Sequence, residues 1–238
     1  MNSSHGAAQR RQRGLSIVEL MVGVAIGLFV VAAASMLVST QLSDNRRLLL
    51  ETQVQQDLRA TADIISRELR RSGYWASARN SVWVSGAAAA ASNPYTGITN
   101  SVGGPEMAAS AVESTVLLSY SRAADEASEN NAVDSAEQIG FRLDNGVIQT
   151  QLGSGNWQAL TDANTMTVSA FTMAMNIQSN TLACAKPCGA LANCPPTQGV
   201  RAITIDITGQ ATHDAAVQRS LRSTVRLRND VVAGACPA

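Results

Sequence analysis

The sequence contains few of the residues on which enzymes depend. Histidine occurs only twice, at His5 and His213, and no P-loop, G-x-S-x-G or H-E-x-x-H motif is present. Gly153-Ser154-Gly155 is typical of a turn between strands. Catalysis needs a nucleophile with a base, a carboxylate pair in a cleft or a set of metal ligands, and the chain offers little of this kind. These absences favour a protein that is not an enzyme and needs no cofactor or metal.

An excess of charge of either sign is also missing. Charged residues make up 15% of the chain and aromatic residues 4%, with 18 basic and 18 acidic side chains. All the basic residues except Lys186 are Arg, and Arg10, Arg11 and Arg13 precede the first apolar run; without them 15 basic face 18 acidic residues, a net charge of −3. The composition therefore indicates neither a nucleic-acid footprint nor an acidic tail, and leaves DNA binding undecided.

The first long feature is an apolar run from Leu15 to Leu42, whose 28 residues exceed the roughly 20 that cross a bilayer as a helix. The arginines before it should stay in the cytoplasm, which places the rest of the chain in the periplasm or beyond. Glu19 interrupts the run, at a cost of about 2.5–3.5 kcal/mol at mid-bilayer on insertion scales, so we expect a partner for it. Gly23 and Gly27 form a small-xxx-small pattern that would let two helices approach closely.

Two other interpretations of this segment follow from the residues alone. A secretory signal peptide would be cleaved near Ala32-Ala33-Ala34, although such segments rarely contain a Glu. A twin-arginine signal would depend on Arg10-Arg11 alone.

The helical pattern continues beyond the apolar run. Neither Gly nor Pro occurs between Leu42 and Gly73, and apolar residues recur at helical spacing, namely Leu50, Val54, Leu58, Ile65 and Leu69. One helix from about residue 15 to 72 would be roughly 87 Å long. Its second half should pack on a globular head.

Beyond Gly73 the sequence favours short strands. They are expected at 82–84, 115–122, 139–152, 200–208 and 221–229, and Asn145-Gly146 predicts a type I′ hairpin turn inside the third. The segment 87–104 is expected to be an exposed, mobile loop. The predicted fold class is therefore α+β, with a long N-terminal helix packed on an antiparallel β-sheet head.

Four cysteines, Cys184, Cys188, Cys194 and Cys236, all lie in the part expected outside the cytoplasm, where disulfides persist. Two bridges have three possible connectivities. A Cys₄ zinc site is the alternative, but the spacing is not that of a standard zinc knuckle. Cys236 could tie the C-terminal tail to the 184–194 loop.

The stretch from Arg13 to Met21, RGLSIVELM, resembles the class III signal of type IV prepilins. The resemblance implies that prepilin peptidase cleaves after Gly14 and methylates Leu15, and that Glu19 pairs with the N-terminal amine of a neighbouring subunit. Leu15 departs from the usual Phe, and Met36 stands where many major pilins have a Pro. In this family the C-terminal disulfide loop is often an adhesive or assembly surface.

The segments VRAITIDITG and SLRSTVRLRN near the C-terminus resemble PilW-type minor pilins and the J-type pseudopilin of type II secretion. The resemblance implies a leader (1–14), a membrane or filament-core helix (15–42), its amphipathic continuation (43–72) and a periplasmic head (73–238). It implies a minor pilin at or near the pilus tip that primes assembly and supports adhesion, twitching or DNA uptake.

The partners so implied are other minor and major pilins, prepilin peptidase and the inner-membrane assembly platform. A minor pseudopilin of a type II secretion system is the alternative. An exported soluble binding protein with a prepilin-like leader is a second one.

Overall fold

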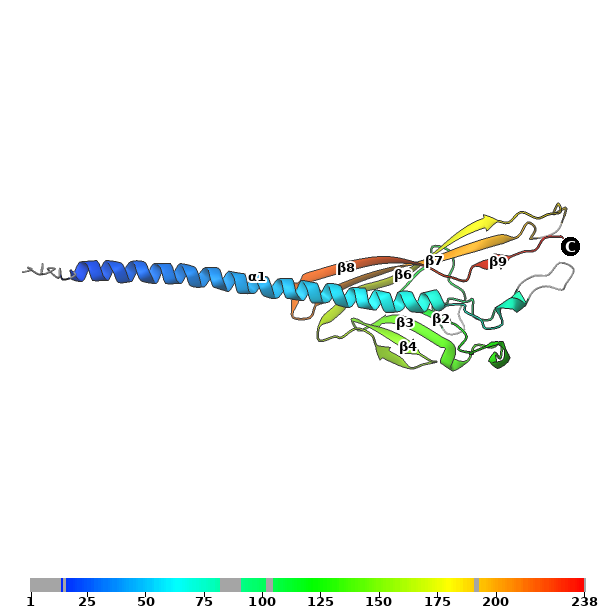
Figure 1. The fold of residues 1–238 in the computed structure, drawn as a ribbon, viewed down its shortest axis with the longest axis horizontal. Coiled ribbons are helices and arrows are strands. Elements are labelled where there is room, and N and C mark those ends of the chain that lie inside the picture. The colour runs from blue at the N-terminus through cyan, green and yellow to red at the C-terminus, as the bar shows by residue number, and fades with distance from the viewer. Residues whose placement is uncertain (1–13, 15, 82–90, 102–104, 191–192, 238) are drawn as a thin grey trace, which may run out of the picture. The chain divides into compact units, whose positions relative to one another are not determined.

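The computed structural model describes residues 14, 16–81, 91–101, 105–190 and 193–237. The chain divides into two compact units, Met1–Leu48 and Leu49–Ala238. The described part of the first unit consists mainly of the N-terminal portion of one helix, α1 (Ile17–Arg71). The second unit, called the head below, holds the rest of α1 and every described strand (Figure 1).

Helix α1 continues from the apolar run into the head without a break, as the sequence predicts. It ends where Gly73 adopts a positive φ of 74°, a conformation that glycine allows at a helix C-terminus. The Gly73 N–H donates to the Ser119 carbonyl oxygen at 2.9 Å, which ties the helix end to the neighbouring strand. The predicted apolar face is confirmed: Val54, Leu58, Ile65 and Leu69 are buried, and Leu50 is partly buried against the same core.

The larger sheet is antiparallel and has five strands in the order β1-β6-β7-β8, with β9 also pairing with β7. Its strands are β1 (Val112–Glu113), β6 (Met166–Thr181), β7 (Thr197–Ala211), β8 (Asp214–Arg226) and β9 (Val231–Ala233). Strand β7 is central because it pairs with β6 on one edge and with β8 and β9 on the other. The two expected strands at 200–208 and 221–229 are thus confirmed within β7 and β8, although β8 ends at Arg226.

The smaller sheet is also antiparallel and has the order β2-β3-β4-β5. Its strands are β2 (Thr115–Ser119), β3 (Gln138–Asp144), β4 (Val147–Leu152) and β5 (Trp157–Ala159). Between β3 and β4, Asn145 and Gly146 have φ values of 48° and 77°, so the predicted type I′ hairpin turn is confirmed. The predicted α+β fold class, a long N-terminal helix with an antiparallel β-sheet head, is confirmed. The strands of the head form two sheets, because β2 to β5 make a ladder separate from that of β6, β7 and β8.

One apolar core joins α1 to both sheets. It contains Leu58 and Ile65 from the helix, Phe141 from β3, and Phe171 and Ile205 from β6 and β7. Burial of such side chains contributes about 25 cal/mol per Å² of apolar surface removed from water, so this shared core is the main source of the head's stability. The helix segment in the head is therefore part of its fold.

Close packing at one point of this core requires a glycine. A Cβ built on Gly209 of β7 would lie 2.5 Å from the sulfur of Met166 and 3.4 Å from Leu58 Cδ2. Gly209 thus lets β6 and the helix side chains approach the sheet backbone.

The expectation of an exposed loop at 87–104 is wrong for its described part. Tyr95 and Ile98 are both 0% exposed, and Thr99 bridges to Leu117 of β2. The apolar and aromatic side chains of this segment bury surface that an exposed loop would leave in water. The strand expected at residues 82–84 lies outside the described residues.

Candidate functional site

The N-terminal processing motif is partly described. Gly14 is exposed and precedes the helix, whereas Leu15 lies outside the described residues. Glu19 is an exposed acidic residue in the first turn of α1, where the unpaired N–H groups favour a negative charge. Its carboxylate is therefore available to a group outside this chain.

The first part of α1 buries none of its apolar side chains within the described structure. All residues from Ser16 to Leu48 are exposed, and the apolar window has a mean hydropathy of 2.5. This is the one helix in the described part of the chain that is long and apolar enough to cross a membrane. Water is a poor solvent for such a surface, so lipid or other helices must cover it.

Gly23 and Gly27 leave a smooth patch on this helix. A Cβ built at either position would meet no heavy atom within 4 Å. Residues four apart lie on the same helix face, so the two glycines open one surface to a neighbouring backbone. The packing of another helix against Gly23 and Gly27 stays a prediction.

The cysteines form two disulfides, Cys184–Cys236 and Cys188–Cys194. Three of them lie in the connection between β6 and β7, and Cys236 follows β9. The predicted tie between the C-terminal tail and the 184–194 loop is confirmed. All four sulfurs are used in these bonds, although Cys184 Sγ also lies 3.9 Å from Cys194 Sγ.

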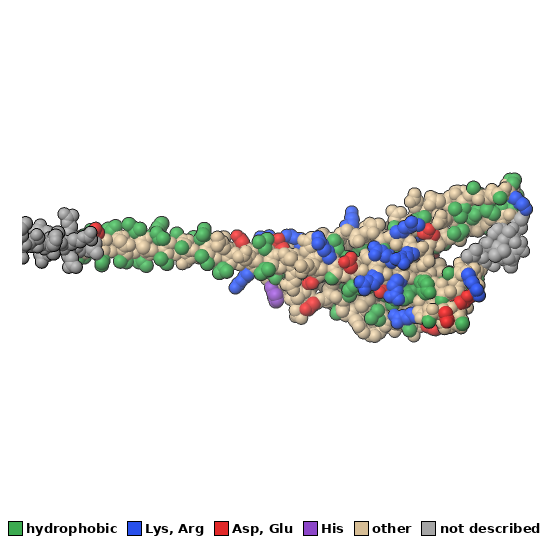
Figure 2. Space-filling view, viewed as in Figure 1, with side chains coloured by type: hydrophobic (Ala, Val, Ile, Leu, Met, Phe, Trp, Pro, Cys, Tyr) green, Lys and Arg blue, Asp and Glu red, His purple; other side chains and the backbone are tan. Residues whose placement is uncertain are grey.

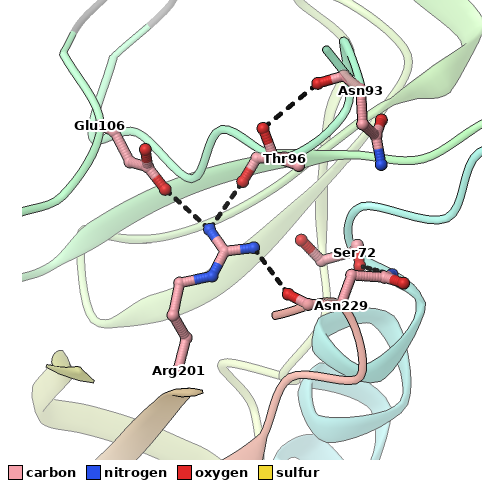
Figure 3. A network of polar contacts seen from close by, with 6 residues as sticks. All are labelled: Ser72, Asn93, Thr96, Glu106, Arg201 and Asn229. Carbon is pink, nitrogen blue, oxygen red and sulfur yellow. Dashed lines mark hydrogen bonds and ion pairs between the residues drawn. The ribbon is translucent and has the colours of Figure 1, made fainter. Parts of the chain in front are cut away.

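A buried arginine holds several segments of the head together (Figure 3). The Arg201 side chain, on β7, is 2% exposed and contacts Glu106 at 2.7 Å. Its guanidinium donates to the backbone oxygens of Thr96 at 2.8 Å and Asn229 at 3.0 Å. Asn229 Nδ2 in turn donates to the Ser72 carbonyl oxygen at 2.8 Å. One side chain thus joins the 91–101 segment, the β7 strand and the chain after β8, and Asn229 extends the link to the end of α1.

A second polar cluster surrounds Tyr95. Its hydroxyl lies 2.9 Å from Glu129 Oε1 and 3.1 Å from Glu137 Oε2, and burial together with these carboxylates raises the pKa of the phenol. Burial by itself would raise the pKa of Glu129, but hydrogen bonds from Ser121, the Asn131 N–H and Tyr95 outweigh it and lower that pKa. The cluster fixes the loops beside β2 and β3.

The remaining candidates for chemistry occupy turns. His213 is exposed between β7 and β8, and Gly153-Ser154-Gly155 is the predicted turn between β4 and β5. The sequence patterns described above do not single out Arg201 or Tyr95. Arg201 carried a signal, because it occupies the inward phase of an alternating strand that continues with Ile203, Ile205 and Ile207.

The chain has an apolar helix that follows a prepilin-like processing motif, and the second half of this helix packs on an antiparallel head. These features define a type IV pilin-like protein. Residues 9–35 match the prokaryotic N-terminal methylation motif. Residues 47–227 match the family described as prepilin peptidase-dependent protein B, and the chain belongs to that family. Searches among curated proteins and among solved structures gave no match.

Proposed function

We propose that the protein is a minor pilin of the PilW type that acts at or near the tip of a type IV pilus. In this role it primes assembly and supports adhesion, twitching motility or DNA uptake, without enzymatic activity. The single observation that carries the proposal is the exposed first part of α1, which contains Glu19, Gly23 and Gly27.

The exposed apolar surface of the first part of α1 needs partners that cover it. A bundle of identical or similar helices would cover the apolar side chains, and the two glycines would let backbones approach within it. Cleavage after Gly14 would create an amine at Leu15 that can neutralise the Glu19 carboxylate of a neighbouring subunit. Assembly would thus remove the cost of a lone carboxylate in an apolar environment.

The proposal places the protein in the inner membrane before assembly, with its head in the periplasm. Membership of a prepilin peptidase-dependent family supports contact with that peptidase and with the pilin machinery. Other minor and major pilins and the assembly platform are its proposed partners. The disulfide-closed 184–194 loop is the proposed adhesive or assembly surface of the head.

The test is the Glu19→Ala variant, expressed in the native host. We expect normal amounts in the membrane fraction, because the change removes a charge from an apolar helix, and loss of the protein from sheared filaments. Asp44→Ala, which removes an exposed acid further along the same helix, is the matched control and should assemble normally. Wild-type levels of Glu19→Ala in filaments would refute the role of the carboxylate.

Mass spectrometry of the native N-terminal peptide tests the step before assembly. A peptide that starts at Leu15 with one added methyl supports prepilin processing. A peptide that starts near Ser35, or at Met1, would instead support an exported or unprocessed protein. Recovery in pilus filaments or in a periplasmic secretion filament then separates the pilin from a type II pseudopilin.

A further inference from the structure

Five exposed arginines gather on the head around two adjoining hollows. The hollows measure about 630 and 330 Å³, and Arg70, Arg71 and Arg228 line both. Arg122 lines the larger hollow and Arg67 the smaller one. We call Arg67, Arg70, Arg71, Arg122 and Arg228 the arginine surface. Lys and Arg side chains lie close together on the viewed face of the head (Figure 2).

Most of this charge has no acidic partner within the described residues. Arg71 contacts Glu68 at 3.5 Å and lies over the Tyr120 ring at 4.2 Å. The other four guanidinium groups make no ion pair with any described residue. Two exposed arginines elsewhere on the head are paired, Arg79 with Glu126 and Arg222 with Asp206. Asp63 is the one acidic residue that lines either hollow.

The end of helix α1 explains only part of this surface. Arg70 and Arg71 occupy the last turn, where the negative end of the helix dipole stabilises cations. Arg122 follows β2 and Arg228 follows β8, so the dipole does not account for their positions. Three separate segments bring positive charge to one place.

An aromatic ring accompanies the arginines. Tyr74 lines the larger hollow and is 48% exposed. One guanidinium group can bind a phosphate through two parallel N–H···O hydrogen bonds. An exposed aromatic ring can stack on a nucleic-acid base. Sites for single-stranded nucleic acid combine these two features.

We propose that the arginine surface binds single-stranded DNA, with backbone phosphates on Arg67, Arg122 and Arg228 and a base stacked on Tyr74. The whole-chain composition conceals this surface, because paired and unpaired arginines count alike in a net charge. The proposal rests on the DNA uptake named in the proposed function and assigns it a surface on the head. A failure to bind DNA would leave the Glu19 experiment unaffected.

The test measures binding of full-length protein in a mild detergent to a labelled single-stranded oligonucleotide by fluorescence anisotropy. The triple variant Arg67→Gln/Arg122→Gln/Arg228→Gln should bind at least about tenfold more weakly. The slope of log affinity against log salt should become shallower by about 2, because each phosphate contact on a single strand contributes about 0.7. Tyr74→Ala should weaken binding by about 5- to 100-fold, the range for loss of one stacked base.

A matched triple variant controls for net charge. Arg59→Gln/Arg79→Gln/Arg226→Gln removes three exposed arginines outside both hollows and should bind as the wild type does. Unchanged thermal unfolding in both triples shows that each variant folds. Equal losses in the two triples, or no binding by the wild type, would overturn the proposal. Displacement of the probe by polyglutamate as effectively as by unlabelled DNA of equal charge would assign the surface to an acidic protein instead.

Discussion

The two parts of helix α1 have opposite surroundings, and the first part is the more apolar one. In the first, Ile17 is 78% exposed and Leu37 63% exposed, while in the second Ile65 and Leu69 are 0% exposed. Secondary structure is the same in both, so helix formation does not explain the difference. The second part has its partners within the chain, and the first part must find them outside it. The comparison separates a region that folds by itself from one that is completed by its environment.

The tryptophans allow the two parts to be measured separately. Trp75, Trp83 and Trp157 all lie beyond Leu49, so tryptophan fluorescence reports on the head alone. Far-UV circular dichroism in detergent reports on the whole of α1 as well. A change in one signal without the other locates an effect in one part.

The largest effect is expected from the long disulfide. Cys184–Cys236 closes a separation of 52 residues and Cys188–Cys194 one of 6. Chain entropy then predicts losses of about 4 kcal/mol and about 2 kcal/mol when each pair is replaced by Ser. Urea unfolding followed by tryptophan fluorescence measures both. If the short bridge contributes as much as the long one, restriction of the unfolded chain is not the source of the stabilisation.

A matched pair of leucines tests the comparison directly. Leu69→Ala removes a side chain buried in the core and should destabilise the head by about 3 kcal/mol, because a cavity remains. Leu37→Ala, at an exposed position of the same helix, should change head unfolding by less than about 0.5 kcal/mol. Equal effects would mean that the two parts unfold as one cooperative unit.

A smaller effect follows from the lowered pKa of Glu129. Its ordinary value is 4.5, and hydrogen bonds in the folded head lower it. The unfolded chain therefore takes up a proton at this carboxylate more readily than the folded head does. The charged Glu129 stabilises the folded head above about pH 4.5, and this stabilisation is lost as the pH falls through the pKa of the folded state. We expect the head's Tm to fall in that range, and to fall less steeply in Glu129→Gln. If the Tm of Glu129→Gln falls with pH as steeply as that of the wild type, Glu129 is not the source of the pH dependence.

The smallest effect on stability is expected at the helix glycines. Gly23→Leu/Gly27→Leu should leave head unfolding unchanged, because both positions lie outside the head and a Cβ at either meets no heavy atom within 4 Å. The bulk should nevertheless reduce incorporation into sheared filaments, by less than Glu19→Ala does. Ala25→Leu, at the intervening position on another helix face, is the control. Normal assembly of the double variant would remove the packing role from this patch.

Local patterns predicted much of the fold. Helix α1, its buried face and the Asn145-Gly146 hairpin each depend on residues that are close in sequence, so the pattern was visible there. Strand β6 was missed because its alternation changes phase. Met166 and Val168 are buried, but the register shift between Val168 and Ala170 moves the next buried residue to Phe171. A period of two is not continuous across such a bulge.

Long-range relations were harder to predict. Nothing local distinguishes one sheet from two, because that depends on which strands pair. Arg201 was visible as a charge at an inward position, but its partners Thr96 and Asn229 are far from it in sequence. The N-terminal motif was recognised most readily, because its information lies in nine consecutive residues from Arg13 to Met21.

The long disulfide also makes the head dependent on synthesis as far as Cys236. Synthesis runs from the N-terminus, so Cys236 is the last cysteine to be made and lies two residues from the end of the sequence. A chain that stops early leaves Cys184 as a thiol, and its sulfur lies 3.9 Å from Cys194 Sγ, within reach of the short bridge. Such a thiol can attack that bridge and exchange with it. Only a chain that includes Cys236 closes both bonds, so the covalent state of the cysteines distinguishes such chains from shorter ones.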